Sequence, residues 1–124
     1  MTTNIEDAGI ESITEIGPTG NPFVPALTDY IDPSAGWSEA EFRHFDAPAN
    51  CTVVGYWTGE PGQVSFESWP YTEVCSVLSG KVAVQDQFGK RRDFVAGEGF
   101  IVPKGFKGTW VTVEPSRKIF VAIE

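Results

Sequence analysis

Residues 72–86, with the sequence TEVCSVLSGKVAVQD, give the clearest indication of the fold of this chain. Two short runs rich in valine, residues 72–78 and residues 81–86, are separated by Ser79 and Gly80. Runs of this length and composition are typical of β-strands, and a short break that contains glycine is typical of a turn. The stretch therefore predicts two strands joined by a turn.

The same pattern continues on both sides of this stretch, from residue 51 to residue 124. Short runs rich in valine, isoleucine, threonine and aromatic residues alternate with turns that contain glycine or proline, and no helical period is present. The runs are 51–58, 63–69, 72–78, 81–86, 92–96, 99–103, 108–114 and 117–124. About eight short strands in succession predict an all-β fold, either a sandwich or a small barrel.

Length and composition limit the class of protein. The 124 residues are the size of one ordinary domain, and 41% of them are hydrophobic, as in globular proteins. No stretch approaches the ~20 apolar residues of a membrane helix, and the acidic start of the chain lacks the apolar core of a signal peptide. The formal net charge of −8 argues against nucleic-acid binding, because few basic residues are available to neutralise the phosphates. We expect a cytoplasmic protein that binds no nucleic acid and no membrane.

Charge divides the chain into two regions. Residues 1–50 carry nine acidic residues and a single basic residue, Arg43, whereas residues 51–124 carry eight of each. We therefore predict an acidic N-terminal arm at residues 1–50 and a β-barrel domain at residues 51–124.

The arm contains more large apolar side chains than a fully solvated tail would expose. They are Phe23, Val24, Leu27, Tyr30, Ile31, Trp37 and Phe42. We expect residues from about 21 onward to pack on the barrel or on a partner subunit, whereas residues 1–20 fit either packing or a partly disordered tail. Residues 37–42 fit a strand or one helical turn capped by Ser38.

Two charged residues fall on apolar faces of the predicted strands. With a period of two, Glu73 shares a face with Cys75, and Lys118 shares a face with Phe120. A buried charge needs an opposite charge or hydrogen-bond donors. We expect Glu73 to contact Lys118, Lys104, or an indole or tyrosine donor inside the barrel.

The chain has two cysteines, Cys51 and Cys75, and no pair with the spacing of a zinc site. Two cysteines do not make a disulfide framework in a cytoplasmic protein. We predict that both are buried free thiols.

Glu73 is followed seven positions later by Gly80, and Gly97 is followed by Pro103 and Gly105. These spacings resemble the two sequence motifs of the cupin superfamily. The resemblance implies a cupin-type antiparallel β-barrel, also described as a double-stranded β-helix or jelly roll. It also implies a homodimer, because such cupins commonly pair through their sheets.

Five short segments resemble, more narrowly, the small single-domain cupins that are grouped with the (S)-ureidoglycine aminohydrolase cupin domain. The segments are Glu73-Val74-Cys75, Ser79-Gly80-Lys81-Val82, Val102-Pro103-Lys104-Gly105-Phe106, Gly108-Thr109-Trp110 and Glu114-Pro115-Ser116-Arg117-Lys118. The resemblance covers about residues 51–124 and implies a recurring glutamate, Pro-x-Gly turn, tryptophan and late lysine.

The metal-binding histidines of the cupin motifs are missing from this sequence. Their positions fall on Phe66 and Ser68, or Glu67 and Trp69, and on Gly108. The single histidine, His44, lies outside both motifs. A tight transition-metal site needs several imidazole, thiolate or carboxylate ligands. We therefore predict no metal and no other cofactor, and keep atypical ligands such as Glu73 with Cys75 as an alternative.

Aromatic and charged residues in the cupin-like segments predict a small-molecule pocket inside the barrel. The predicted pocket residues are Trp57, Trp69, Tyr71, Glu73, Cys75, Lys104, Trp110 and Lys118. Glu73 and Lys118 are also the candidate catalytic residues, because a poised buried carboxylate suits acid–base chemistry. For each single tryptophan, simple core filling is the competing interpretation.

Three functions fit these residues. The first is a metal-independent cupin that binds, and as an enzyme transforms, a small polar or amino-bearing metabolite, by analogy with ureidoglycine aminohydrolase. The second is a non-catalytic ligand-sensing or accessory module, and the third is a metallo-cupin with atypical ligands. Replacing Glu73 with glutamine should weaken ligand binding while preserving the fold.

Overall fold

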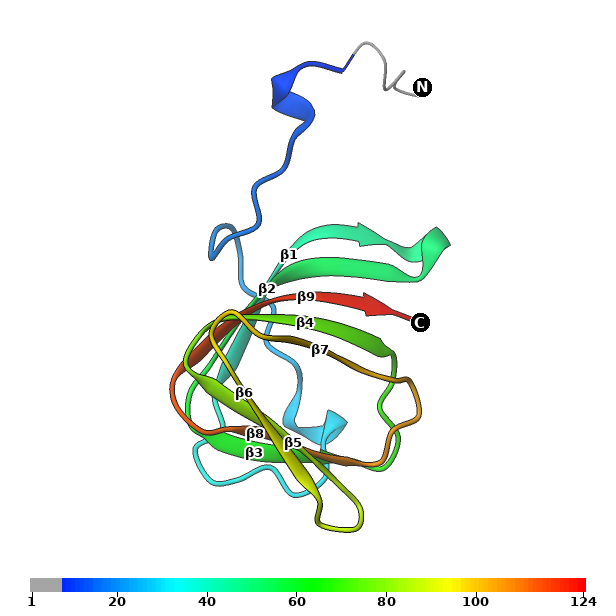
Figure 1. Cartoon of the computed structure of the whole chain (residues 1–124). Coiled ribbons are helices and arrows are strands. Elements are labelled where there is room, and N and C mark those ends of the chain that lie inside the picture. The colour runs from blue at the N-terminus through cyan, green and yellow to red at the C-terminus, as the bar shows by residue number, and fades with distance from the viewer. Residues whose placement is uncertain (1–7) are drawn as a thin grey trace.

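The structure, a computed structural model, describes residues 8–124 and consists of two antiparallel β-sheets that face each other (Figure 1). The five-stranded sheet has the order β1 (Glu39–Ala47), β2 (Thr52–Gly59), β9 (Ser116–Ile123), β4 (Thr72–Ser79) and β7 (Gly99–Val102). The four-stranded sheet has the order β3 (Gly62–Phe66), β8 (Gly108–Thr112), β5 (Lys81–Asp86) and β6 (Arg91–Val95). Three short 3₁₀ turns lie in the described part: η2 (Ile10–Ser12), η3 (Leu27–Asp29) and η4 (Pro48–Asn50).

Each of the eight predicted runs forms a strand, which confirms the all-β prediction. The chain crosses between the two sheets at most of its turns, so the strands enclose a jelly-roll barrel as predicted. In the part of the chain that the structure describes, no helix has the length and apolarity required to span a membrane.

A ninth strand, β1, lies before the predicted start of the barrel at residue 51. It pairs with β2 in antiparallel register from Glu39–Gly59 to Ala47–Thr52, so residues 37–42 lead into a strand and not into a helical turn. The larger sheet therefore contains residues that the charge pattern had placed in the arm.

The arm segment before β1 bridges the two sheets. Phe23 pairs with Glu41 on β1, and Ile31 pairs with Ser65 on β3, through backbone hydrogen bonds of 2.7–2.9 Å. Because β1 and β3 are edge strands of different sheets, this segment covers the gap between those two edges. The opposite pair of edges, β6 and β7, has no such cover among residues 8–124.

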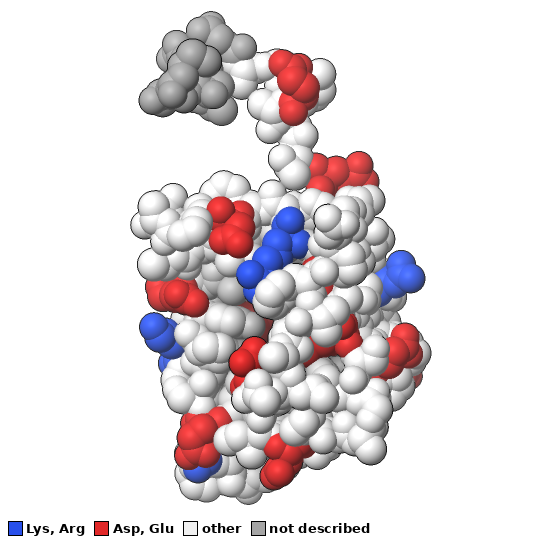
Figure 2. Space-filling view, turned by 180° about the vertical axis from the view of Figure 1, so that it is seen from behind, with Lys and Arg blue, Asp and Glu red and all other residues white. Residues whose placement is uncertain are grey.

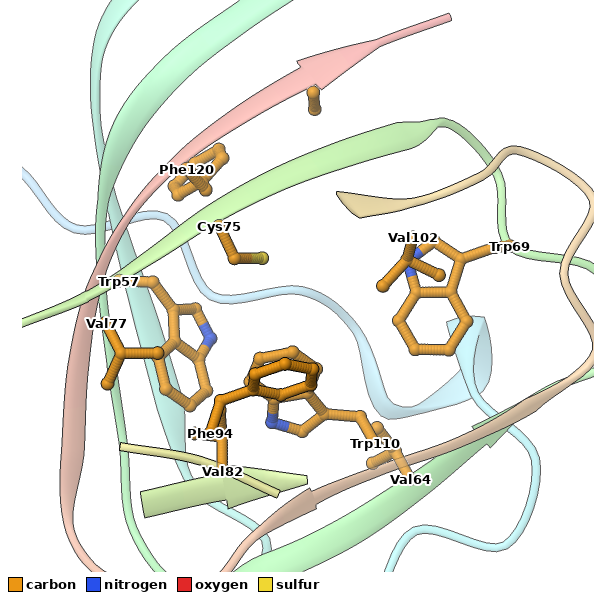
Figure 3. Packing of buried hydrophobic residues seen from close by; sticks show 11 residues of the cluster. Trp57, Val64, Trp69, Cys75, Val77, Val82, Phe94, Val102, Trp110 and Phe120 are labelled. Carbon is orange, nitrogen blue, oxygen red and sulfur yellow. The ribbon is translucent and has the colours of Figure 1, made fainter. Parts of the chain in front are cut away.

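The core lies between the sheets and is rich in aromatic rings (Figure 3). Period-two alternation holds as predicted: Glu73 and Cys75 are buried on β4, and Lys118 and Phe120 are buried on β9. Trp57 and Trp110 pack edge to face with ring centroids 5.5 Å apart, and Phe94 stacks on Phe100 at 4.1 Å. Such pairs add to the free energy gained by burying the rings.

The two cysteines differ in their surroundings. Both are free thiols as predicted, but only Cys75 is buried, and the prediction of a buried Cys51 is wrong. Cys51 follows η4 with a φ of 51°, a conformation used at the ends of helical turns. The chain reverses direction there between β1 and β2, which leaves the side chain at the surface.

The turn glycines offer a test of the β4–β5 connection. Gly80 and Gly105 both have positive φ, 82° and 89°, so an alanine at either site is strained by the backbone alone. A Cβ on Gly80 would lie 2.3 Å from the Pro115 carbonyl oxygen, whereas a Cβ on Gly105 would meet nothing within 4 Å. We expect Gly105→Ala to lower the free energy of unfolding by about 1 kcal/mol and Gly80→Ala by about 2–4 kcal/mol. Urea unfolding measures both; equal losses would contradict the close packing of this turn.

Candidate functional site

A buried ion pair occupies the inner face of the five-stranded sheet. Lys118 on β9 lies opposite Val77 on β4, and its side chain runs along β4 toward Glu73. The Nζ of Lys118 lies 2.5 Å from Oε2 of Glu73 and 3.6 Å from Sγ of Cys75. Glu73 and Lys118 are only 6% and 4% exposed, so neither charge is solvated. The two residues that the sequence singled out as buried charges are therefore each other's partner.

Neighbouring side chains complete the hydrogen bonding of this pair. The indole of Trp69 donates to Oε1 of Glu73 at 3.1 Å, and the Cys75 thiol donates to Oε2 at 3.3 Å. The Lys118 ammonium lies 3.9 Å from the ring centroid of Trp110 and 4.9 Å from that of Trp57. Attraction between a cation and aromatic ring faces is stronger when both are removed from water.

Both members of the pair are held in their charged forms. Burial alone would raise the pKa of Glu73, but the charge of Lys118 and hydrogen bonds from Lys118, Trp69 and Cys75 lower it. Burial alone would lower the pKa of Lys118, but Cys75 and Glu73 raise it. Burial is also the largest cause of the raised pKa of Cys75, so this thiol stays protonated and is a poor nucleophile at neutral pH.

A second carboxylate, Glu39 on β1, collects three donors in the same interior. It accepts hydrogen bonds from the indoles of Trp37 at 2.8 Å and Trp57 at 2.9 Å, and from the hydroxyl of Tyr30. Burial, followed by the charge of Glu39, raises the pKa of Tyr30 and keeps its hydroxyl protonated. Trp57 joins the two clusters, because its N–H faces Glu39 while its ring faces Lys118.

A small cavity lies between these two clusters, with a volume of about 40 Å³. A cavity of this size holds on the order of one water molecule. The aromatic side chains therefore fill most of the interior, as the core-filling interpretation predicts. Glu41 and Tyr71 line this cavity and also two outer cavities of about 280 and 370 Å³. These two side chains thus stand between the solvent and the interior.

The structure brings together most, but not all, of the predicted pocket residues. Six of the predicted residues line the interior cavity: Trp57, Trp69, Tyr71, Glu73, Trp110 and Lys118. Cys75 contacts the ion pair from the side. Lys104 does not belong to the site: its side chain is exposed in the turn after β7, and its backbone N–H donates to Thr72. The Pro-Lys-Gly turn lies outside the barrel, so its lysine remains in solvent.

The predicted pocket lacked Tyr30, Trp37, Glu39 and Glu41, which come from the arm and from β1. A signal for them is present, because Trp37, Glu39 and Glu41 follow each other at every second position, as side chains on one face of a strand do. The high acidic content of residues 1–50 concealed it.

The interior does not fit the metal site of histidine-containing cupins. Both oxygens of Glu73 already accept hydrogen bonds, and the nearest charged group is a lysine, which cannot bind a metal while protonated. His44 instead lies with Nε2 2.7 Å from the carbonyl oxygen of Gly17. Within residues 8–124, no three histidine, cysteine or carboxylate side chains form a group that could hold a metal ion.

We expect protein purified without chelators to contain well below one transition-metal ion per chain, because Lys118 takes the position of a cation beside Glu73. Elemental analysis measures the content. About one ion per chain, lost in a Glu73→Ala variant but retained in a Glu67→Ala variant, would contradict this expectation.

Comparison with known proteins agrees with this architecture. The family model of the EutQ-like cupin domain matches residues 47–120. This chain belongs to the EutQ-like cupin family. A search of curated proteins by sequence gives no match.

Several solved structures share the fold at low sequence identity. The EutQ protein of Clostridium difficile is 20% identical, with a TM-score of 0.69 over 93% of this chain and 90% of that one. A putative ethanolamine utilization protein Q of Salmonella typhimurium LT2 is 16% identical, with a TM-score of 0.65 over 89% and 98%. A DUF861-family protein of unknown function from Pseudomonas syringae pv. tomato is 19% identical, with a TM-score of 0.70 over 82% of this chain and 43% of that one. These similarities establish the fold alone.

The ion pair makes a specific stability prediction. Glu73→Gln leaves the Lys118 ammonium buried without a counter-charge, so we now expect it to cost about 3–5 kcal/mol of unfolding free energy. The double variant Glu73→Gln/Lys118→Met should lose much less than the sum of the single variants. Glu67→Gln, which breaks the exposed Lys107–Glu67 contact of 3.1 Å, is the control and should change little. Additive losses in the double variant would contradict a coupled pair.

The same pair predicts a pH window. Because the pKa of Glu73 is lowered on folding, its charge adds to the free energy of unfolding above about pH 5. This contribution is lost as the pH falls through the pKa that Glu73 has in the folded protein. Because the pKa of Lys118 is raised on folding, its charge adds to the free energy of unfolding below about pH 10. This contribution is lost as the pH rises through the pKa that Lys118 has in the folded protein. The stability difference between the unmodified protein and the double variant should therefore be greatest between these limits. Urea unfolding across that range measures it, and a flat difference would contradict the assignment.

Proposed function

We propose that this protein is a cupin that binds a small amino-bearing metabolite in the barrel interior, without a metal ion. The observation that carries the proposal is the charge balance of the interior. Three carboxylates, Glu39, Glu41 and Glu73, line the cavity together with a single ammonium group, that of Lys118. Lys118 pairs with Glu73, and Arg43 pairs with Glu41 at 3.1 Å, so among residues 8–124 no cationic side chain pairs with the third carboxylate, Glu39.

A ligand ammonium group matches this environment better than an anion does. It would be attracted to Glu39 and would donate charge-assisted hydrogen bonds to that carboxylate, which accepts three hydrogen bonds in the structure. A carboxylate or phosphate placed there would be repelled by the carboxylate of Glu39. The charge balance therefore supports an amine and disfavours a purely anionic ligand.

Access to the interior requires the arm to move. Tyr30 and Trp37 come from the segment before β1 and donate to Glu39, the position that the ligand ammonium would take. An incoming ammonium group supplies equivalent donors to Glu39, so the carboxylate stays satisfied while Tyr30 and Trp37 swing outward. The small cavity then enlarges by the volume of these two side chains.

The proposal predicts selectivity for the amine. Ethanolamine and ethylene glycol differ only by an amino group in place of a hydroxyl, and one solved structure of the same fold is described as a putative ethanolamine utilization protein. We expect ethanolamine and other small primary amines to raise the melting temperature and to give a measurable heat in isothermal titration. Ethylene glycol and glycolate should do neither. Equal responses to all of these compounds would refute an amine site.

Two variants locate the site. Glu39→Gln keeps an acceptor for the indoles but removes the charge, so amine affinity should fall by about tenfold or more. Glu67→Gln removes an exposed carboxylate elsewhere and should leave the affinity unchanged. Circular dichroism and urea unfolding check that the Glu39 variant is folded, and an unchanged affinity in a folded Glu39→Gln protein would exclude this location.

Binding is favoured over catalysis by the Glu73–Lys118 pair, because groups that stay charged near neutral pH transfer protons poorly. Glu41 supports the second candidate, an enzyme that uses acid–base chemistry. Burial raises its pKa despite the Arg43 guanidinium 3.1 Å away, and it lies between the outer cavities and the interior.

Turnover separates the two candidates. Reaction of a small aminated compound, including ureidoglycine as the analogy suggests, would favour the enzyme, and Glu41→Gln should then abolish activity while sparing amine binding. Saturable binding of amines with no reaction of any of them would favour a ligand-sensing module.

A further inference from the structure

The two open sides of the barrel differ in what covers them. The gap between edge strands β1 and β3 is closed by the chain's own arm, which pairs with Glu41 on one side and Ser65 on the other. The gap between the other two edge strands, β6 and β7, is a cleft of about 770 Å³. No described segment of the chain crosses it.

The cleft is apolar with a basic rim. Its apolar lining includes Phe94, Phe100, Phe106 and Ile101, and Ile101 is 63% exposed. The basic residues at its edge are Lys90, Arg91 and Arg92, and the acidic residue is Asp86. Arg91 pairs with Asp93, whereas Lys90 and Arg92 have no carboxylate partner within residues 8–124. Asp86 accepts hydrogen bonds from the backbone of the β5–β6 turn.

The N-terminal tail, residues 8–16, has the opposite character. It extends away from the barrel in Figure 1 and stands clear of the molecular surface in Figure 2. Ile10 and Ile13 are 85% and 72% exposed, and Glu11 and Glu15 lie between and beside them. Isolated isoleucines at such exposure bury nothing in the single chain, which costs hydrophobic free energy that a docking partner would recover.

We propose that the tail of one copy docks into the β6–β7 cleft of a second copy. Ile10 and Ile13 would enter the apolar cleft, and Glu11 and Glu15 would face Lys90 and Arg92. A reciprocal exchange of this kind gives a closed twofold dimer in which both open clefts are covered.

A second copy fits the tail better than the chain's own cleft does. The tail leaves the barrel next to Gly17, which is held by His44 on β1, and β1 and β7 are opposite edges of the same sheet. Four strand spacings of ~4.8 Å separate these edges by roughly 19 Å, whereas the four residues from Gly17 to Ile13 reach about 14 Å at most. Ile10, seven residues from Gly17, could span this distance at about 25 Å, but Ile13 could not, so the chain's own cleft cannot take both isoleucines.

Sedimentation velocity on the full chain tests the apolar contact. We expect a dimer whose dissociation constant rises about tenfold or more in Ile10→Ser/Ile13→Ser. The control is Val24→Ser/Leu27→Ser, which changes two comparably exposed apolar residues of the arm outside the tail and should leave the dissociation constant unchanged. A full-length protein that is monomeric at micromolar concentrations, or a dimer indifferent to the tail variant, overturns the proposal.

Charge exchange tests the pairing. Lys90→Glu/Arg92→Glu should weaken the dimer, and so should Glu11→Lys/Glu15→Lys, because each places like charges opposite each other. The chain that carries all four changes should regain most of the dimer affinity and lose it with added salt, as the original does. If the chain with all four changes loses as much dimer affinity as the two double variants lose in sum, the acidic tail and the basic rim are not partners.

Disulfide trapping distinguishes a second copy from the chain's own cleft. In a Cys51→Ser background, copies with Ile13→Cys are mixed with differently tagged copies that carry Ile101→Cys. We expect a mixed disulfide between the two tagged chains, and none when Leu78→Cys, on the outer face of β4, replaces Ile101→Cys. The proposal is overturned if the Leu78→Cys copies form the mixed disulfide as readily as the Ile101→Cys copies do. It is also overturned if a disulfide forms only within one chain that carries both Ile13→Cys and Ile101→Cys.

Discussion

The buried pair of Glu73 and Lys118 is the interaction on which the arrangement of the barrel interior depends. Two full charges on adjacent strands, away from water, are tolerated only because each is within hydrogen-bond distance of the other. This requirement holds both side chains on the inner face of the five-stranded sheet, with the Lys118 ammonium 2.5 Å from Oε2 of Glu73. With Glu73 paired to Lys118, the interior carboxylate that has no cationic partner among residues 8–124 is Glu39.

The rest of the interior is organised around a second carboxylate. Glu39 on β1 collects donors from the arm and from β2, and it thereby ties the N-terminal segment to the barrel. The arm and the site are consequently parts of one structure. The arm segment that closes the barrel between β1 and β3 also supplies the side chains that lie beside Glu39. The opposite side, between β6 and β7, lacks an equivalent cover in the described chain.

The predictions from the sequence are correct where a pattern along one strand is enough to indicate burial or fold. Alternation along 72–78 and 117–124 identified Glu73 and Lys118 as buried charges, and glycine and proline spacing identified the cupin fold. The predictions are wrong where composition was taken as a guide to burial. Glu39 and Glu41 were placed in the acidic arm and left out of the predicted pocket, and Lys104 was assigned to the pocket because of a motif.

By itself, the sequence determined the strands, their inward faces, the absence of motif histidines and the cupin superfamily, because these depend on neighbouring residues and short spacings. Only the tertiary structure decided that the partner of Glu73 is Lys118 and not Lys104, and that Glu39 shares the interior. It also decided which sheet edges stay open. Contacts of this kind join residues tens of positions apart, and the distance between such residues is set by how the strands are ordered in the sheets, which no local pattern encodes.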